Sequence, residues 1–162
     1  MNTFQERLLQ LDRDLLSGNN ICSSRGVLNA FPSSLKKLFL MRGLGLIICR
    51  QGNFQFALNQ RLFRANAGET LFIPEDSHFQ VLQESEDMEV FILAYQIQPI
   101  RDIIGNSVVS MYMYSQLIPE PCYVWTTGEE NEIVKYMSLL DSALEMAVSY
   151  THLRAHETCA DL

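Results

Sequence analysis

The chain has 162 residues, of which 48% are hydrophobic and 19% are charged, a balance typical of one globular domain with a full core. Its net charge of −7 argues against direct binding to nucleic acid or to an anionic membrane, because both need concentrated positive charge. No run approaches the roughly 20 apolar residues of a membrane span, and the N-terminus lacks the apolar core of a signal peptide, so we expect a cytoplasmic protein.

An amphipathic arm is predicted at the N-terminus, in residues 1–20. Its apolar residues recur at steps of four, three and four and form one stripe of a short helix: Phe4, Leu8, Leu11 and Leu15. Gly18 ends this helix. The polar, irregular residues 19–37 predict at most one short strand, around Val27 and Leu28.

The pattern becomes that of β-strands over the rest of residues 21–97. We expect strands at Leu38–Leu40, Leu44–Cys49, Phe54–Leu58, Leu62–Phe63, Thr70–Ile73, His78–Gln83 and Met88–Gln96. Turn signals separate them at Gln51-Gly52-Asn53, Asn59-Gln60 and Asn66-Ala67-Gly68. The strand at Met88–Gln96 is too apolar for one of its faces to lie in water. Short strands at this spacing indicate a β-barrel or sandwich.

The stretch from Gly68 to His78 is the most informative part of this region. Glycine supplies the positive φ of a turn, the apolar residues before Pro74 suit a half-buried strand, and Pro74 ends the strand because it lacks an N–H group. The segment therefore predicts a turn, a buried strand and a second turn, with one imidazole at the mouth of a barrel.

Residues 98–147 predict a helical region with a short extended piece, Cys122–Trp125, between two helices. Thr127–Glu130 has the pattern of a capping box at the start of the second helix. The apolar residues behind it step by four, three and four: Ile133, Met137, Leu140 and Leu144. This stripe can pack on its own barrel, on the preceding helix or on a second copy of the chain.

The last residues, 148–162, resemble the conceptual translation of a transposon-based sequencing adapter and are expected to be non-native. His152 and His156 have the spacing of two metal ligands on one helix face, but they fall in this tail. Removing it deletes one positive and two negative charges, which changes the net charge from −7 to −6. His78 is then the one histidine left, and the natural protein is expected to continue beyond the junction.

The cysteines give no sign of a metal site or a disulfide framework. They stand singly in the sequence, without a Cys-x-x-Cys pair, at Cys22, Cys49, Cys122 and Cys159. We expect buried or incidental thiols in a reducing compartment.

The order of a polar arm, a compact β-barrel with a Gly-x5-Pro turn and then helices resembles the N-terminal sensing and dimerisation domain of AraC-family transcriptional regulators. The likeness covers roughly residues 20–147. The family's second cupin motif has a glycine two residues after the proline and a histidine three residues later. Gly68 and Pro74 keep the spacing, whereas Asp76 replaces the second glycine and His78 arrives one residue early.

The resemblance implies a mainly β fold, a cupin-type (jelly-roll) β-barrel with C-terminal α-helices. It also implies a small-molecule effector such as a sugar, and a homodimer formed by the helix with the stripe Ile133 to Leu144. DNA would be bound only through a C-terminal pair of helix-turn-helix units, of which these residues contain none. No cofactor is implied, and neither the effector nor the sign of regulation follows from the sequence.

Four residues are candidate effector contacts. Arg50 ends a hairpin strand, where sugar-sensing relatives place an effector-binding arginine; a solvated arginine is the alternative. His78 and Gln80 are two residues apart and so share a strand face; a turn histidine bonded to backbone or water is the alternative for His78. Phe91 is a candidate apolar wall or a core residue.

The alternative hypothesis is a stand-alone cupin, either a sugar-binding protein or a metal-dependent enzyme. Catalytic cupins hold their metal through several histidines and a carboxylate, mostly on the hairpin that here spans Leu44–Leu58. This hairpin has no histidine, aspartate or glutamate, and no second base accompanies His78. We therefore expect neither a catalytic nor a metal site.

Overall fold

The computed structural model describes residues 3–17, 21–96 and 123–126, and the helical positions Leu139, Ser142, Ala143 and Met146. The chain divides into two compact units, Met1–Gly128 and Glu129–Leu162. Apart from strand β9 and those four positions, the region predicted to be helical lies outside the described residues, as does the whole of the tail at 148–162.

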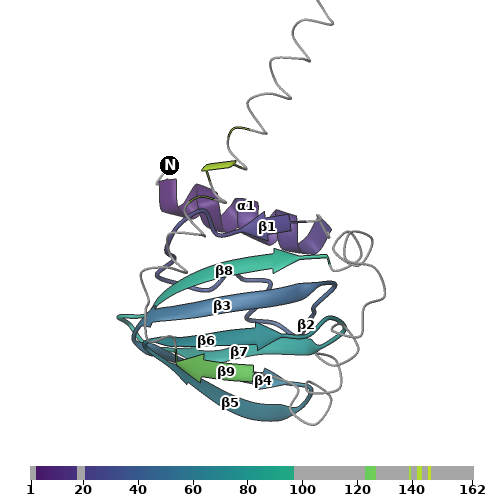
Figure 1. Cartoon of the computed structure of the whole chain (residues 1–162), viewed down its shortest axis with the longest axis vertical. Helices are drawn as coiled ribbons and strands as arrows, with labels where there is room; N and C mark the ends of the chain where they lie inside the picture. Colours follow the sequence, from purple (N-terminus) through teal and green to yellow (C-terminus); the bar gives the residue numbers. More distant parts are fainter. Residues whose placement is uncertain are drawn as a thin grey trace, which may run out of the picture. The chain divides into compact units, whose positions relative to one another are not determined.

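The first unit contains one described helix and nine described strands (Figure 1). The helix is α1, Thr3–Ser17. The strands are β1 (Ile21–Ser23), β2 (Phe39–Leu40), β3 (Leu44–Gln51), β4 (Asn53–Leu58), β5 (Arg61–Asn66), β6 (Glu69–Ile73), β7 (His78–Glu84), β8 (Glu89–Tyr95) and β9 (Tyr123–Thr126).

The strands form two antiparallel sheets, with the orders β1-β8-β3-β6-β9 and β2-β7-β4-β5. The first eight strands pair in a nested manner, β1 with β8, β2 with β7, β3 with β6 and β4 with β5. Folding one long antiparallel ribbon over on itself produces this order, which is that of a jelly roll. The predicted mainly β fold is confirmed.

One hydrophobic core joins the two sheets. Each sheet turns alternate residues inward, as period-two strands require, and aromatic rings fill the centre. Phe54, Phe56 and Phe79 are completely buried, and the Phe56 ring lies 5.4 Å from those of Phe63 and Phe79. These side chains fill the space between the two sheets.

The neighbouring strands β3 and β8 of the five-stranded sheet are apolar on both faces, as predicted for the strand at Met88–Gln96. Ile47 and Ile92 belong to the core between the sheets. Their neighbours Ile48 and Phe91 point the opposite way because side chains alternate along a strand, yet they are only 1% and 3% exposed.

Three turns explain local features of the sequence. Asn59 and Gln60 have φ of 48° and 69°, so both central residues of the β4–β5 turn are left-handed, as a tight hairpin requires. Gly68 has φ of 83°. Asp76, at the place of the motif's second glycine, has φ of 61° and so keeps the glycine-like conformation.

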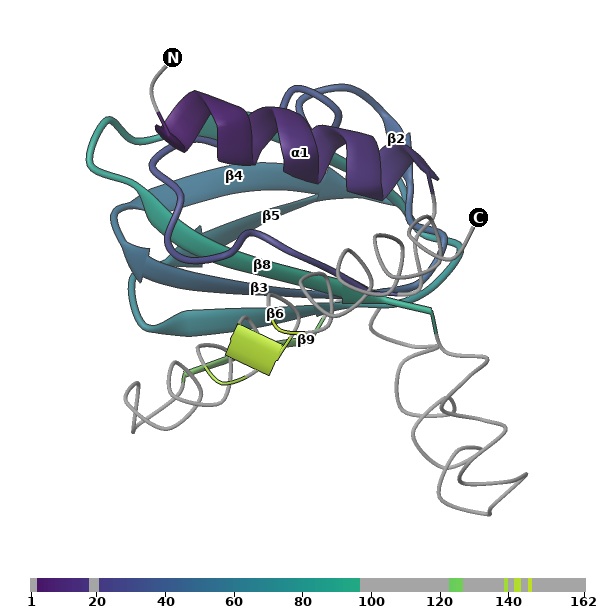
Figure 2. The ribbon, with the colours of Figure 1, turned by 90° about the horizontal axis from the view of Figure 1, so that it is seen from above.

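The arm is part of the barrel's core. Leu11 and Leu15 of α1 are buried with the sheet residues, and Asp12 Oδ1 accepts a 2.9 Å hydrogen bond from the backbone N–H of Ser34. Figure 1 shows α1 beside β1, at the β8 side of the five-stranded sheet, and Figure 2 shows it lying over the strands. Within the described residues, no helix is both long and apolar enough to cross a bilayer.

The strand predicted around Val27 and Leu28 is wrong in position. β1 lies earlier, at Ile21–Ser23, and Leu28 forms only an isolated bridge with Val90. The sequence contains little sign of β1, because the strand has just three residues and its buried residues, Cys22 and Ser23, are small.

Candidate functional site

The structure does not bring the four predicted effector contacts together. Arg50 is exposed at a β-bulge near the end of β3, where Gln51 pairs with Glu89. His78 begins β7, where it pairs with Leu40 of β2. Strand β4 runs antiparallel to β7, so Phe54 pairs with Glu84 at the end of β7 and Leu58 pairs with Phe79 near its start. Arg50 is close to the start of β4 and His78 is close to its end. The two residues therefore lie at opposite ends of the barrel.

Gln80 and Phe91 lie on the outer faces of different sheets. Gln80 alternates with the buried Phe79 and Val81, and its Nε2 donates a 3.2 Å hydrogen bond to the carbonyl of Lys36. Phe91 points away from the core on the other sheet. No single cavity can therefore be lined by all four residues, and their roles remain predictions.

His78 is exposed, and its backbone bonds to the Asn59 turn. Its N–H donates to Asn59 Oδ1, and its carbonyl accepts from the Asn59 N–H, both at 2.9 Å. Across the described ranges, no group of histidine, cysteine and carboxylate side chains is arranged to hold a metal ion.

Burial makes the two described cysteines poor nucleophiles. Cys22 and Cys49 are free thiols inside the barrel. Loss of solvation, aided by the charge of Asp14, raises the pKa of Cys22 to about 12. Loss of solvation likewise raises the pKa of Cys49 to about 11, with Glu69 and Asp87 adding to the effect. These thiols stay protonated at neutral pH, as expected for structural cysteines.

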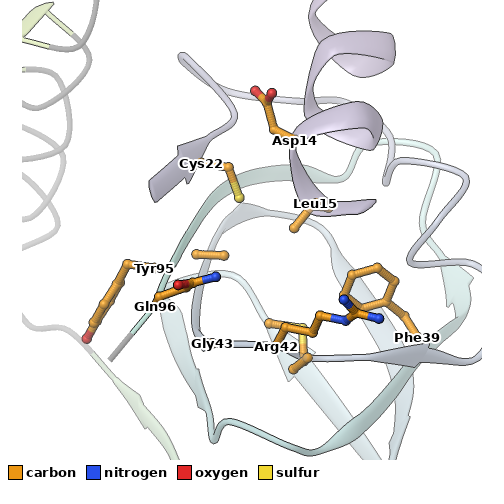
Figure 3. Close-up of a pocket in the computed structure, with 10 residues that line it drawn as sticks. Asp14, Leu15, Cys22, Phe39, Arg42, Gly43, Tyr95 and Gln96 are labelled. Atoms are coloured by element: carbon orange, nitrogen blue, oxygen red, sulfur yellow. The ribbon is translucent and has the colours of Figure 1, made fainter. Parts of the chain in front are cut away.

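A small pocket lies where α1, β1, β2 and β8 meet (Figure 3). Leu15 and Cys22 point into it, and Arg42, Tyr95 and Gln96 stand around it. Its cavity volume is about 30 Å³, which holds about one or two water molecules. It is too small for an effector.

A larger pocket lies between α1 and the turn after β1, with a volume of about 370 Å³. We call it the arginine pocket. It is lined by Glu6, Arg7, Gln10, Leu11, Arg13, Ser23, Ser24 and Arg25. Three arginines and one glutamate give this lining a net charge of +2 on a chain whose net charge is −7.

Arg7 ties the two walls of the arginine pocket together. Its Nη1 donates a 2.9 Å hydrogen bond to the carbonyl oxygen of Arg25, and its guanidinium carbon lies 5.9 Å from the centre of the Phe4 ring. A Cβ on Gly26 would come within 2.9 Å of the same Nη1, so glycine makes room for the arginine. In the described part of the chain, Arg7 Nε is buried without a hydrogen-bond acceptor.

Sequence reasoning missed the arginine pocket because its residues come from two segments without a recognised motif. A weak signal was present: Arg7, Gln10 and Arg13 recur every three residues, on the part of the helix next to the apolar stripe. Nothing in the sequence showed that Arg25 faces them.

The predicted dimerisation stripe lies outside the described residues. The four described helical positions of the second unit are all exposed, with Leu139 66% and Met146 69% accessible. The stripe's role stays a prediction.

No protein-family model and no curated protein sequence matches the chain. The structure is distantly similar to ToxT of Vibrio cholerae, over 86% of this chain and 57% of ToxT, with 11% identity and a TM-score of 0.49. ToxT with a bound unsaturated fatty acid matches over 60% of this chain and 38% of that one, with 10% identity and a TM-score of 0.43. A cupin 2 conserved barrel domain protein from Salinispora arenicola matches over 41% and 57% of the two chains, with 12% identity and a TM-score of 0.34. The chain therefore spans less than two thirds of each of these proteins, and the fold assignment rests on its own strand order.

Proposed function

We propose that this chain is the effector-sensing and dimerisation domain of a bacterial AraC-type transcriptional regulator, whose DNA-binding helix-turn-helix units are carried by other residues. The observation that carries the proposal is the packing of the N-terminal arm, helix α1, against the barrel. Leu11 and Leu15 of α1 share the core of a jelly roll, and the barrel keeps the Gly68-x5-Pro74 spacing on which the family resemblance rests. A ligand that binds between α1 and the barrel can change how tightly α1 packs on the barrel.

The core chemistry favours a binding module over an enzyme. The inward residues of the hairpin β3–β4 are Ile47, Cys49, Phe54, Phe56 and Leu58, which pack against each other and offer no acid, base or imidazole. Cys49 is the sole potential nucleophile among them, and burial keeps its thiol protonated. General acid–base chemistry in this barrel would need groups that the hairpin does not supply.

Regulation requires that the effector bind one state of the domain more tightly than another. In the proposed mechanism the effector changes the population of the docked arm or of the dimer, and so the spacing of two DNA-binding units. A two-fold dimer suits this role because paired half-sites on DNA have the same symmetry.

Dimerisation can be tested by fusing the chain to a heterologous helix-turn-helix domain that represses a reporter only as a dimer. We expect repression by the fusion and none by the helix-turn-helix domain alone. In parallel, light scattering of the purified chain should give twice its mass of 18.6 kDa. A monomer in both assays would contradict the dimerisation part of the proposal, and stoichiometric bound metal with turnover would favour the cupin enzyme.

A further inference from the structure

We propose that the arginine pocket binds a small hydrophilic metabolite through a carboxylate or phosphate group. The pocket is separate from the four residues predicted as effector contacts and from the interior of the sandwich. Binding of an anion in this pocket does not depend on the proposed function. A regulatory role for the bound anion does rest on the proposed function.

Arg7 supplies the first argument, an unused donor in a fixed position. Nη1 is committed to the carbonyl of Arg25, which fixes the plane of the guanidinium. Nε is closed to solvent and has no acceptor among the described residues, so an anion reaches it only if neighbouring side chains shift. A buried donor without an acceptor is costly, and an oxyanion is the acceptor that binds a guanidinium edge most strongly.

The charge of the lining supplies the second argument. Arg13 and Arg25 are exposed at the rim, and Glu6 is the one acidic side chain among the lining residues. Clustered like charges repel one another, so a bound anion would stabilise the lining. The preference for anions holds although the chain as a whole is acidic.

The backbone at Arg25 supplies the third argument. Its φ of 48° lies in the left-handed region, which is unusual for arginine and costs free energy. Two serines hold the turn: Ser23 Oγ accepts from the N–H of Arg25, and Ser24 Oγ donates to the carbonyl of Gly26 at 2.6 Å. Strain that neighbouring bonds maintain at a charged pocket is a common feature of ligand sites.

The size and polarity of the pocket define the class of ligand. A volume of about 370 Å³ falls in the range of small-molecule sites, about 300–1,000 Å³. The uncharged lining residues are Gln10, Ser23 and Ser24, whose side chains hydrogen-bond to protein groups, and Leu11, the sole aliphatic lining residue. A hydroxylated metabolite with one or two negative groups fits this lining better than a hydrocarbon chain.

Binding can be measured on the purified chain by calorimetry and by the shift of its melting temperature, at constant ionic strength. The probes are citrate for carboxylates, glucose 6-phosphate for phosphates and glucose as the neutral control. We expect saturable binding and a higher melting temperature with at least one anion and no effect of glucose. The anion that binds identifies the preferred group, and no saturable binding of either anion would overturn the proposal.

Three variants locate the site. Arg7→Gln and Arg25→Gln should each weaken anion binding about tenfold or more, because each removes a charge-assisted hydrogen bond. Arg64→Gln removes the same charge from β5 and should leave the affinity unchanged. Arg25 is exposed, so its variant should fold even where Arg7→Gln does not. Equal losses in all three variants would indicate nonspecific charge attraction and refute the site.

The same variants separate this inference from the proposed function. If the variants lose anion binding but the reporter is still repressed, the chain can still dimerise as the regulator model requires. The anion would then not be needed for dimerisation. Anion binding by a strictly monomeric chain would support the pocket and contradict the dimerising regulator.

Discussion

Nη1 of Arg7, in α1, donates a hydrogen bond to the backbone carbonyl of Arg25, which follows it by 18 residues in the sequence and lies in the turn after β1. This bond fixes a guanidinium against a left-handed residue, so the arm and the barrel are joined by a polar contact as well as by Leu11 and Leu15. The turn at Arg25 should therefore affect both the stability of the fold and the binding of an anion.

Replacement of Arg25 by glycine should separate these two properties. Glycine adopts a φ of 48° without the penalty that arginine has, which should offset its greater freedom in the unfolded chain. We expect the free energy of unfolding to be unchanged or to rise by up to about 1 kcal/mol, while anion affinity falls. Denaturant titration and calorimetry on the same samples measure both, and a variant that is less stable yet binds normally would show that Arg25 supports the fold alone.

The Phe56 side chain should be the most sensitive position of the core. It is completely buried, and its ring lies 5.7 Å from that of Phe54 and 5.4 Å from that of Phe79. Phe56→Ala should lower the free energy of unfolding by about 3–5 kcal/mol, because it removes the ring and leaves a cavity. Leu62→Ala, at a side chain that is 76% exposed, should change it by less than about 0.5 kcal/mol. Similar losses in urea titrations of the two variants would contradict the assignment of the core.

The β-barrel could be predicted from the sequence because most of its strands and turns have clear local sequence patterns. The alternation of Phe54, Phe56 and Leu58 and the turn at Gly68 predicted β4 and β6 to within one residue, whereas β5 is longer than the predicted Leu62–Phe63 and ends at Asn66. Asp76 shows the limit of motif comparison: the glycine is lost from the sequence, but its left-handed conformation is kept.

The site was harder to predict because it depends on contacts between distant segments. The spacing of His78 and Gln80 correctly placed both on one face of β7, but it could not show that this face points away from the core. The arginine pocket depends on the docking of α1 against the turn at Arg25, and no local pattern records which side chains meet there.

The buried thiols predict a loss of stability in alkali. The folded pKa values of Cys22 and Cys49, about 12 and about 11, lie above the ordinary value of 9.0. Below pH 9 both thiols are protonated in the folded and unfolded states, and as pH rises the unfolded chain loses these protons first. Stability should therefore fall by about 1.4 kcal/mol per pH unit for each thiol until the folded thiol also ionises.

Denaturant titrations from pH 8 to pH 11 measure this slope. A Cys22→Ala, Cys49→Ala double variant is the control, because it removes both titrations whatever it does to the stability at pH 8. We expect a shallower fall in the variant, and parallel curves would mean that the two thiols are as solvated in the folded protein as in the unfolded chain.

The proposed dimer should depend on the predicted stripe that contains Leu140, and a charge placed in this stripe tests the dependence. Leu140→Glu should convert the dimer to a monomer at micromolar concentration, because a buried carboxylate without a partner opposes association strongly. Leu62→Glu makes the same chemical change on an exposed side chain of β5 and should leave the dimer intact. Light scattering gives the mass, and circular dichroism shows whether each variant retains its fold. If a folded Leu140→Glu variant remains dimeric, the stripe is not the interface, and the exposed Leu139 and Met146 become the next positions to charge.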